Sequence, residues 1–122
     1  MSLKSIINDL FKAMNSGDFS NADNFLDDNI SFDFPGTEKV VGKKRVVLFL
    51  KVLLRKYPGL TFQVNDLIID NENQKACAVW TNHAKTLDNN EYNNSGITLC
   101  HIKDGKISYL SDYFKVTSFI KD

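Results

Sequence analysis

The stretch GITLCHIKDGKISYLSDYF, residues 96–114, is typical of a β-hairpin. Two runs rich in β-branched and aromatic residues flank the dipeptide Asp104–Gly105, which tolerates the positive φ that tight turns require. Alternate residues of a strand lie on the same side, so the second run places Leu110, Asp112 and Phe114 together. This hairpin is the strongest single indication of an antiparallel sheet in the chain.

Asp112 is the exception on a side of that strand that is otherwise apolar. Both sides of the strand are largely apolar, so we expect both to be covered by protein. Burying an unpaired charge is costly. The carboxyl of Asp112 therefore needs a hydrogen-bond partner, a solvent-filled cavity or a raised pKa.

The turn between the two runs decides which side chains face Asp112. A three-residue loop with Gly105 in the left-handed region places Thr98 and Cys100 on its side and Gly96 directly across from it. A two-residue turn instead places Ile97 and Leu99 there. We favour the three-residue loop.

Hydrophobic periodicity predicts helices before this sheet and strands after them. An apolar stripe from Leu3 to Met14 predicts a first helix, which Gly17 ends in the left-handed conformation. Ser20 and Asp23 resemble a capping box that opens a short second helix to about Asp28. A third helix is expected over residues 43–57. Strands are expected at 29–36, 60–69, 75–87 and 91–102, with a bulge at 65–66 where the apolar phase slips by one residue.

Length and composition favour one compact domain over residues 1–122. Hydrophobic residues make up 43% of the chain, which is enough for a core. Fifteen basic residues balance 15 acidic ones, which argues against a nucleic-acid or membrane-surface partner. The longest apolar run is interrupted by Lys51 and is too short to span a bilayer, and no signal-peptide pattern is present. We expect a cytoplasmic protein.

The order of these elements, with FKAMNSGDFSNADNFLDDNISFDFPG, VVGKKRVVLFL, LIIDNENQKACAVW and GITLCHIKDGKISYLSDYF, resembles the SnoaL-like family. This family belongs to the nuclear transport factor 2-like superfamily, which includes ketosteroid isomerase. The resemblance covers nearly the whole chain. It implies an α+β fold in which a cone-shaped, curved antiparallel sheet wraps around three N-terminal helices. It also implies a pocket at the open end and a homodimer formed through the outer sheet face.

The same resemblance implies roles for side chains that line such a pocket. Asp112 would be a general base or acid, with Leu110 and Phe114 beside it on the closing strand. Trp80 is either a pocket wall or ordinary core, and Asn82 is either a polar contact for a ligand or a solvated strand residue. The full set of expected ligand-binding residues is Phe32, Phe34, Trp80, Asn82, Thr98, Leu110 and Phe114.

The sequence departs from ketosteroid isomerase at three positions that carry its chemistry. Phe34 stands where the base of that enzyme lies, Leu10 where its tyrosine lies, and Thr98 near its buried acid. Steroid isomerisation by that machinery is therefore not expected. Asp33, one residue from Phe34, should point to the opposite side of its strand and is interpreted as structural.

The remaining reactive side chains have no pattern that indicates a site. Cys77 and Cys100 do not form a metal-type pair and are interpreted as free thiols. His83 and His101 have no metal-ligand spacing, so we expect neither a metal nor a cofactor. His101 is expected on the outer face.

Three hypotheses follow from this pattern. The first is an isomerase-, cyclase- or hydrolase-type enzyme in which Asp112 moves a proton on a small apolar or cyclic molecule. The second is a non-catalytic protein that binds such a molecule. The third is a dimerisation domain in which the cavity is vestigial and Asp112 is structural.

Overall fold

The structure is a computed structural model that describes residues 2–116 of the chain. The described part contains two α-helices, one short 3₁₀ helix (η1) and six strands. They follow the order α1 (Leu3–Ser16), η1 (Ala22–Asn24), β1 (Leu26–Asp33), β2 (Val40–Val41), α2 (Lys43–Lys56), β3 (Thr61–Asp70), β4 (Lys75–Lys85), β5 (Glu91–Lys103) and β6 (Lys106–Phe114).

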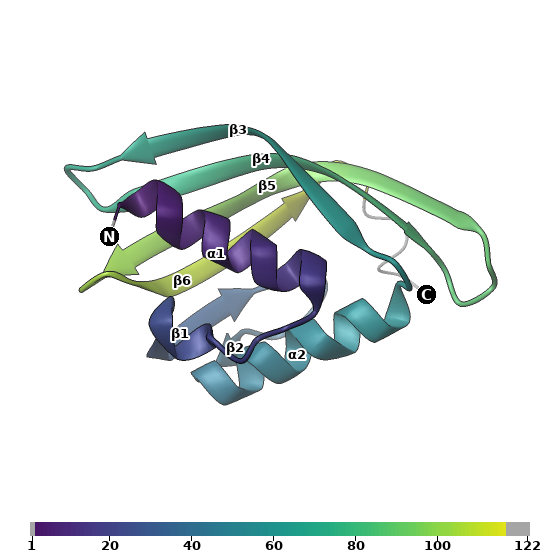
Figure 1. Cartoon of the computed structure of the whole chain (residues 1–122), viewed down its shortest axis with the longest axis horizontal. Helices are drawn as coiled ribbons and strands as arrows, with labels where there is room; N and C mark the ends of the chain where they lie inside the picture. The colour runs from purple at the N-terminus through teal and green to yellow at the C-terminus, as the bar shows by residue number, and fades with distance from the viewer. Residues whose placement is uncertain (1, 117–122) are drawn as a thin grey trace.

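The six strands form one curved sheet in the order β2-β1-β6-β5-β4-β3, and α1 lies along its concave side (Figure 1). Strands β3 to β6 are consecutive antiparallel neighbours, as the sequence predicts. Strand β1, however, pairs in parallel with β6. The sheet is therefore mixed, and the expectation of a wholly antiparallel sheet is wrong for the pair β1 and β6. The α+β class and the wrapping of the sheet around the helices are confirmed.

The expected second helix, from Ser20 to about Asp28, is wrong. Only η1 forms there, and no side-chain hydrogen bond caps it. The backbone N–H of Ser20 instead donates to the carboxylate of Asp18, which forms a local turn. Strand pairing then begins early, because Leu26 pairs with Ile107 and the N–H of Ile107 donates to the carbonyl of Phe25. Pairing with the last strand therefore outcompetes the local helix signal.

The turn between β5 and β6 also differs from the expected three-residue loop. Lys103 pairs with Lys106, so the turn has two residues, Asp104 and Gly105, both with positive φ. The register then shifts between His101 and Ile102 on β5. On β6 the partners of these two residues are Tyr109 and Ile107, so Ser108 is the additional residue of a bulge.

The bulge changes which residue of β5 lies opposite Asp112. Thr98 pairs with Asp112, not Ile97 as a regular two-residue turn would give. Gly96, expected opposite Asp112, pairs instead with Phe114. The expectation that Thr98 and Cys100 share the side of Asp112 is confirmed, although by a different turn.

The other helix and strand predictions agree with the structure, although the strand expected at 29–36 lies at 26–33. The left-handed conformation of Gly17 closes α1, and its N–H donates to the carbonyl of Ala13. The predicted bulge in β3 appears as a register shift between Val64 and Asp66. Neither helix within residues 2–116 is long and apolar enough to cross a membrane.

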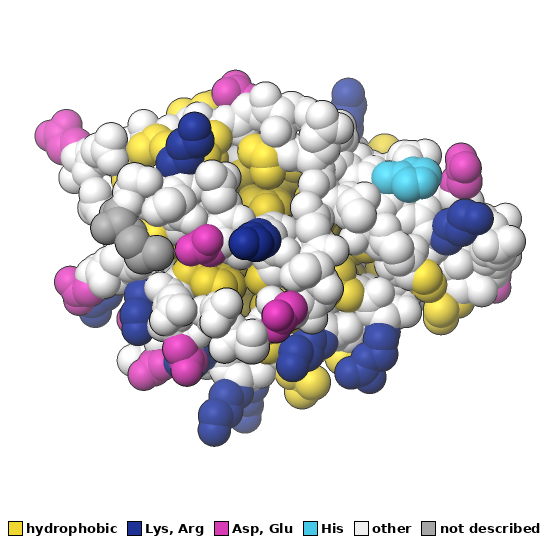
Figure 2. All heavy atoms as spheres, in the orientation of Figure 1, with side chains coloured by type: hydrophobic (Ala, Val, Ile, Leu, Met, Phe, Trp, Pro, Cys, Tyr) yellow, Lys and Arg dark blue, Asp and Glu magenta, His cyan; other side chains and the backbone are white. Residues whose placement is uncertain are grey.

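The core lies between α1, α2 and the concave face of the sheet. The side chain of Asn15, at the end of α1, fixes this helix to β3. Its amide donates to the carbonyl of Phe62 at 3.0 Å and accepts from the Phe62 N–H at 2.7 Å. On the outside, basic and acidic side chains are interspersed over the face shown in Figure 2, with no extended area of one sign.

Gly96 gives the first testable prediction. A Cβ at this position would collide with the carbonyl oxygen of Tyr113 and lie 3.0 Å from Cη2 of Trp80. Replacing Gly96 with Ala should therefore destabilise the fold by about 1–3 kcal/mol, as overpacking of a rigid site does. Urea unfolding measures this change, with Ser95→Ala on the same strand as the control. Equal stability of Gly96→Ala and the wild type would show that the Trp80 ring and strand β6 do not pack tightly against Gly96.

Candidate functional site

A small hollow of about 20 Å³ lies between α1 and the concave face of the sheet. Its volume is sufficient for about one water molecule. Nine side chains from six elements line it, and eight of them are apolar or hydroxyl-bearing; the ninth is Asp112. The lining residues are Leu10, Phe11, Met14, Phe32, Leu50, Phe62, Thr98, Leu110 and Asp112.

Two consecutive hydrogen bonds connect Asp112 to the core. The indole Nε1–H of Trp80 donates to Oγ1 of Thr98 at 2.9 Å, and the Thr98 hydroxyl donates to Oδ1 of Asp112 at 2.7 Å. Thr98 is the only side-chain hydrogen-bond partner of Asp112 among residues 2–116. In the described part of the chain, the acid therefore has one hydroxyl donor and no cation to stabilise its charge.

Burial in this apolar hollow raises the pKa of Asp112 to about 7, although the hydrogen bond from Thr98 acts in the opposite direction. Asp112 keeps a small exposed surface, which fits a carboxyl at the wall of a narrow cavity. Both protonation states are therefore populated near neutral pH. A group of this kind can accept or release a proton without a large energetic penalty.

The structure brings together four of the eight expected site residues around this hollow. They are Phe32, Thr98, Leu110 and Asp112. Leu110, Asp112 and Phe114 share one side of β6, as alternation predicts. However, Phe114 lies beyond the hollow. The roles of all these residues in binding or catalysis remain predictions.

Phe34, Trp80 and Phe114 instead pack edge-to-face with one another and with neighbouring rings. Phe34 contacts Phe114 with ring centroids 5.2 Å apart, and Phe114 contacts Trp80 at 5.5 Å. The stack continues from Trp80 to Phe62 at 5.0 Å and from Phe34 to Phe49 at 5.1 Å. Such contacts are favourable aromatic geometry. Phe34, Trp80 and Phe114 therefore do not line the hollow beside Asp112, and Phe34 and Phe49 instead line a separate cavity of about 240 Å³.

Asn82 lies two residues along β4 from Trp80, away from Asp112. It is buried, and it pairs with Phe62 on one side and Asn94 on the other. Among the described residues, 2–116, its Oδ1 has no hydrogen-bond partner. The alternative of a solvated strand residue is therefore wrong. A buried amide oxygen without a partner is unusual and costs stability.

Five residues of the hollow were not expected at the site. Leu10, Phe11 and Met14 come from α1, Leu50 from α2 and Phe62 from β3. Their helical and strand periodicity indicates a core position and does not distinguish core from cavity wall. The one available signal was the resemblance, which places a functional tyrosine of ketosteroid isomerase at Leu10.

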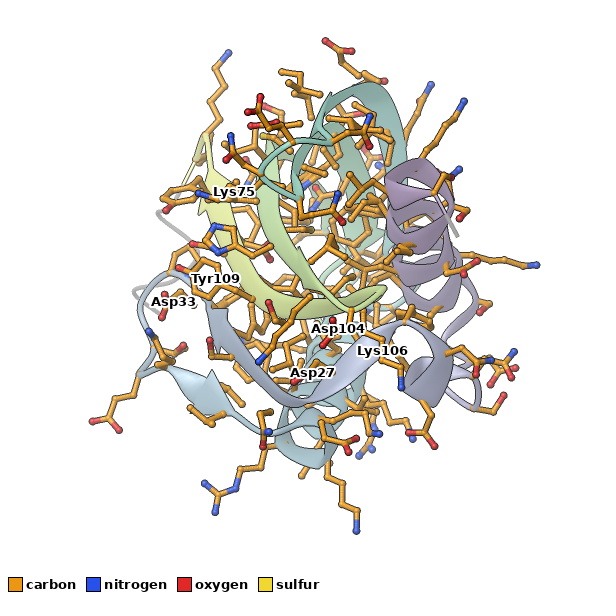
Figure 3. All side chains as sticks on the ribbon, turned by 90° about the vertical axis from the view of Figure 1, so that its left-hand side faces the viewer. Asp27, Asp33, Lys75, Asp104, Lys106 and Tyr109 are labelled. Carbon is orange, nitrogen blue, oxygen red and sulfur yellow. The ribbon has the colours of Figure 1, made fainter. Side chains whose placement is uncertain are left out.

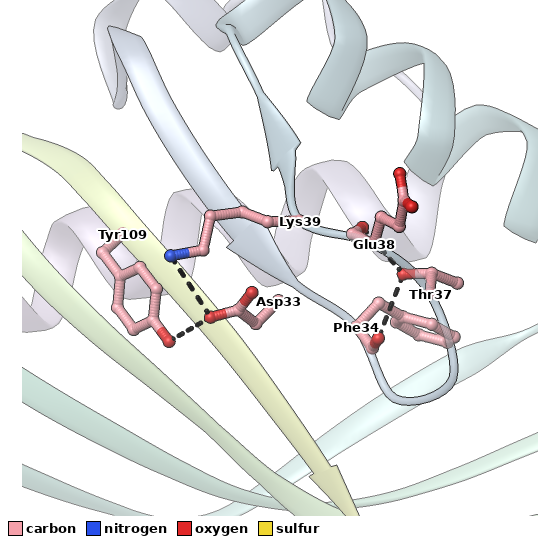
Figure 4. Close-up of polar contacts among 6 residues, drawn as sticks. All are labelled: Asp33, Phe34, Thr37, Glu38, Lys39 and Tyr109. Carbon is pink, nitrogen blue, oxygen red and sulfur yellow. Dashed lines mark hydrogen bonds and ion pairs between the residues drawn. The ribbon is translucent and has the colours of Figure 1, made fainter.

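Asp33 lies outside this site, on the opposite side of β1, as predicted. Its carboxylate accepts a hydrogen bond from the Tyr109 hydroxyl at 2.6 Å and lies 3.9 Å from Nζ of Lys39 (Figure 4). Figure 3 shows Asp33 and Tyr109 close together on the neighbouring strands β1 and β6. This hydrogen bond raises the pKa of Tyr109. The three side chains join β1, β6 and the loop before β2.

The cysteines and histidines do not form a reactive cluster. Cys100 is buried, and burial raises the pKa of its thiol, which disfavours the nucleophilic thiolate. His101 stacks on Tyr109 at 4.9 Å on the outer face, where it was expected. Within residues 2–116, no group of three or more His, Cys, Asp or Glu side chains is arranged to hold a metal ion.

A curved sheet around two helices, with an acid facing an apolar interior, defines an α+β protein of the nuclear transport factor 2-like fold. The chain matches the SnoaL-like domain family over residues 7–110, and it belongs to that family. The comparison with curated proteins found no match.

Similar solved structures support the fold at low sequence identity. One is a protein from Pseudomonas putida, provisionally described as a polyketide cyclase, with TM-score 0.83 and 20% identity over 99% of this chain and 97% of that one. Another, from Bacillus subtilis, is provisionally described as an isomerase, with TM-score 0.81 and 18% identity over 98% and 92%. A third, from Jannaschia, provisionally described as a SnoaL-like polyketide cyclase, has TM-score 0.82 and 13% identity over 93% and 85%.

The pKa of Asp112 generates a prediction about stability and pH. Its folded-state pKa lies above the ordinary value of an aspartate, so the folded protein holds this proton more tightly than the unfolded chain does. Raising the pH from about 4 to about 7 should therefore reduce stability, by at most about 1.4 kcal/mol per pH unit. At pH values above the folded-state pKa of Asp112, this group causes no further loss of stability.

Replacing Asp112 with Asn removes this ionisation. The variant should be more stable than the wild type at pH 8, and this advantage should shrink as the pH falls to 5. Urea unfolding at several pH values measures the difference, and Asp104→Asn in the exposed turn controls for the loss of one negative charge. An advantage that is independent of pH would contradict a buried, protonatable Asp112.

Proposed function

We propose that this SnoaL-like protein is an enzyme that moves a proton on a small, mostly apolar molecule, with Asp112 as the group that carries the proton. The observation that supports this proposal best is the carboxyl itself. Asp112 faces an apolar hollow, accepts one hydrogen bond and has a pKa near 7. A carboxyl in the core of a purely structural domain is normally paired with a cation or with several donors.

The chemistry best suited to this site is proton transfer next to a carbonyl group. The ionised carboxylate takes a proton from the carbon beside the carbonyl, and the resulting acid returns it to the same or another atom. Isomerisation and cyclisation of carbonyl compounds both begin with such a step. A positioned general base contributes about 10²–10⁴-fold to such a reaction. The apolar walls favour a cyclic or otherwise compact substrate without charge.

Substrate binding must enlarge the hollow, because a volume of about 20 Å³ accepts little more than water. Met14 and Leu10 on α1 form part of its wall. Methionine is flexible and adapts to different neighbours. Displacement of these α1 side chains would admit a ligand beside Asp112 while the β5–β6 hairpin keeps its register.

The same small volume favours a second candidate function. A domain whose interior is filled by the stack of Phe34, Phe114 and Trp80 has no need of a substrate. In that case Asp112 is an acid that the core tolerates. The protein then acts only by binding a small molecule or a second copy of itself. The two functions differ in one measurable property, which is proton exchange catalysed by Asp112.

The test uses small cyclic ketones as probes, namely cyclopentanone, cyclohexanone and 2-tetralone, in deuterated water. The wild type should accelerate exchange of the hydrogens beside the carbonyl, followed by NMR or mass spectrometry. Asp112→Asn should reduce this acceleration by about 10²-fold or more. Asp33→Asn, on the outer side of β1, is the matched control and should retain it. Exchange that is unchanged in Asp112→Asn, or absent from the wild type with all three ketones, would favour the binding function.

We also propose that the protein is a homodimer formed through the convex face of the sheet. The centre of this face carries adjacent apolar side chains on three strands, because Val79 pairs with Ile97 and Ile97 with Tyr113. Ile68 and Tyr113 are 58% and 53% exposed. Large exposed apolar patches of this kind indicate interaction surfaces.

Charged side chains of both signs frame this apolar centre. Asp66 and Asp70 lie on β3, and Lys75 and Lys103 lie at the ends of β4 and β5. A second copy related by two-fold symmetry can therefore place acids against lysines around the apolar contact. This arrangement favours a copy of the same chain as the partner.

Replacing Ile97 with Lys should convert the dimer to a monomer, because it places a charge at the centre of the contact. Analytical ultracentrifugation at micromolar concentration measures the mass. Asn93→Lys, further along β5 on the same face, is the control and should leave the dimer intact. A wild-type mass of one chain would contradict the proposed dimer.

A further inference from the structure

We propose that Trp80 is a positioning residue for Asp112: its indole N–H fixes the Thr98 hydroxyl as a donor to Oδ1, so that the exchangeable proton is carried by Oδ2. The use of this arrangement in catalysis rests on the proposed function. The arrangement itself is a property of the protein without substrate. It can therefore be tested separately from any enzymatic activity.

The direction of both hydrogen bonds follows from the chemistry of the donors. An indole N–H can only donate, so Oγ1 of Thr98 accepts at 2.9 Å. A threonine hydroxyl has a single hydrogen, and this hydrogen remains for Oδ1 of Asp112 at 2.7 Å. Trp80 and Thr98 are 1% and 5% exposed. Water therefore has little access to replace either partner.

The second carboxyl oxygen is in a different environment. Within residues 2–116, Oδ2 of Asp112 makes no hydrogen bond, and it is not among the buried polar atoms that lack a partner. It therefore keeps access to the hollow. Because Thr98 already donates to Oδ1, protonation of Oδ1 would place two hydrogens between the same pair of oxygens. The proton is consequently favoured on Oδ2.

The indole cannot easily turn away from Thr98. Its ring packs edge-to-face against Phe62 and Phe114, with interplanar angles of 86° and 67°. The backbone at Gly96 lies against its far edge, where a Cβ would already be 3.0 Å from Cη2. Trp80 is therefore held by packing on both sides. Its N–H is a fixed dipole and not a mobile one.

The surroundings of Asp112 contain little else that would titrate with it. The side chains that face the hollow from α1, α2, β1 and β3 are Leu10, Phe11, Met14, Leu50, Phe32 and Phe62, and none of them ionises. On β5 the nearest ionisable group is the buried thiol of Cys100, which stays protonated. Replacing Trp80 should therefore alter the pKa of Asp112 mainly through the Thr98 hydroxyl.

Trp80 is the single tryptophan of the chain, which gives a direct spectroscopic reporter. The ¹⁵N–¹H resonance of its indole should shift with pH, with the same midpoint as the ¹³Cγ resonance of Asp112. Thr98→Val should abolish the shift of the indole resonance, because it removes the connection between the two groups. Thr98→Ser should restore it. An indole resonance that is independent of pH while Asp112 titrates would overturn the proposal.

A second measurement uses the pKa of Asp112 in Trp80→Phe. Without the indole donor, the Thr98 hydroxyl is free to rotate and accept a hydrogen from neutral Asp112. The pKa of Asp112 should therefore rise by about half to one pH unit. Phe49→Leu removes a ring of the same aromatic stack that contacts Phe34 and not Trp80, and it should leave the pKa of Asp112 unchanged.

The double variant completes a thermodynamic cycle. In a Thr98→Val background, Trp80→Phe should have no further effect on the pKa of Asp112. An equal rise with and without the Thr98 hydroxyl would overturn the proposal, since it would assign the effect to packing alone. These measurements use the protein without substrate. Absence of ketone exchange would therefore contradict the proposed enzyme and leave this inference standing.

Discussion

The bulge at Ser108 in β6 is the feature on which the candidate site depends. Ile107 and Leu110 are both buried in the core, yet they are three residues apart, and a regular strand would place them on opposite faces. One additional residue between Ile107 and Tyr109 resolves this conflict. It also places Asp112 beside Thr98 on the concave face. A β6 without this bulge, paired through the same turn, would place Ile97 opposite the acid.

Much of the architecture could be predicted from local patterns. The apolar stripe of α1, the bulge near Asn65 and the Asp-Gly turn each have a physical signature in a few residues. The helix expected after Ser20 shows where such patterns fail. A capping box is a local signal, and the pairing of Leu26 with Ile107 joins segments about 80 residues apart, which no local pattern reveals.

The site was harder to predict than the fold. Alternation correctly placed Leu110, Asp112 and Phe114 on one side of β6. It could not indicate how much space remains beside Asp112, because that volume depends on side chains of six different elements. Phe34 and Trp80 have the residue types of a pocket wall, and here they pack against each other through Phe114. Residue type alone therefore does not separate an open cavity from a filled one.

The position of β6 between β1 and β5 has a consequence for synthesis of the chain. Strand β6 pairs with β1 on one side and β5 on the other. Hydrogen bonds therefore cannot join all six strands into one sheet until residues 106–114 have left the ribosome. Until then β1 lacks its main partner, and the apolar faces of α1 and α2 remain uncovered on one side. A chain of this topology keeps an open sheet edge until β6 has been synthesised, and chaperones can protect this edge during that interval.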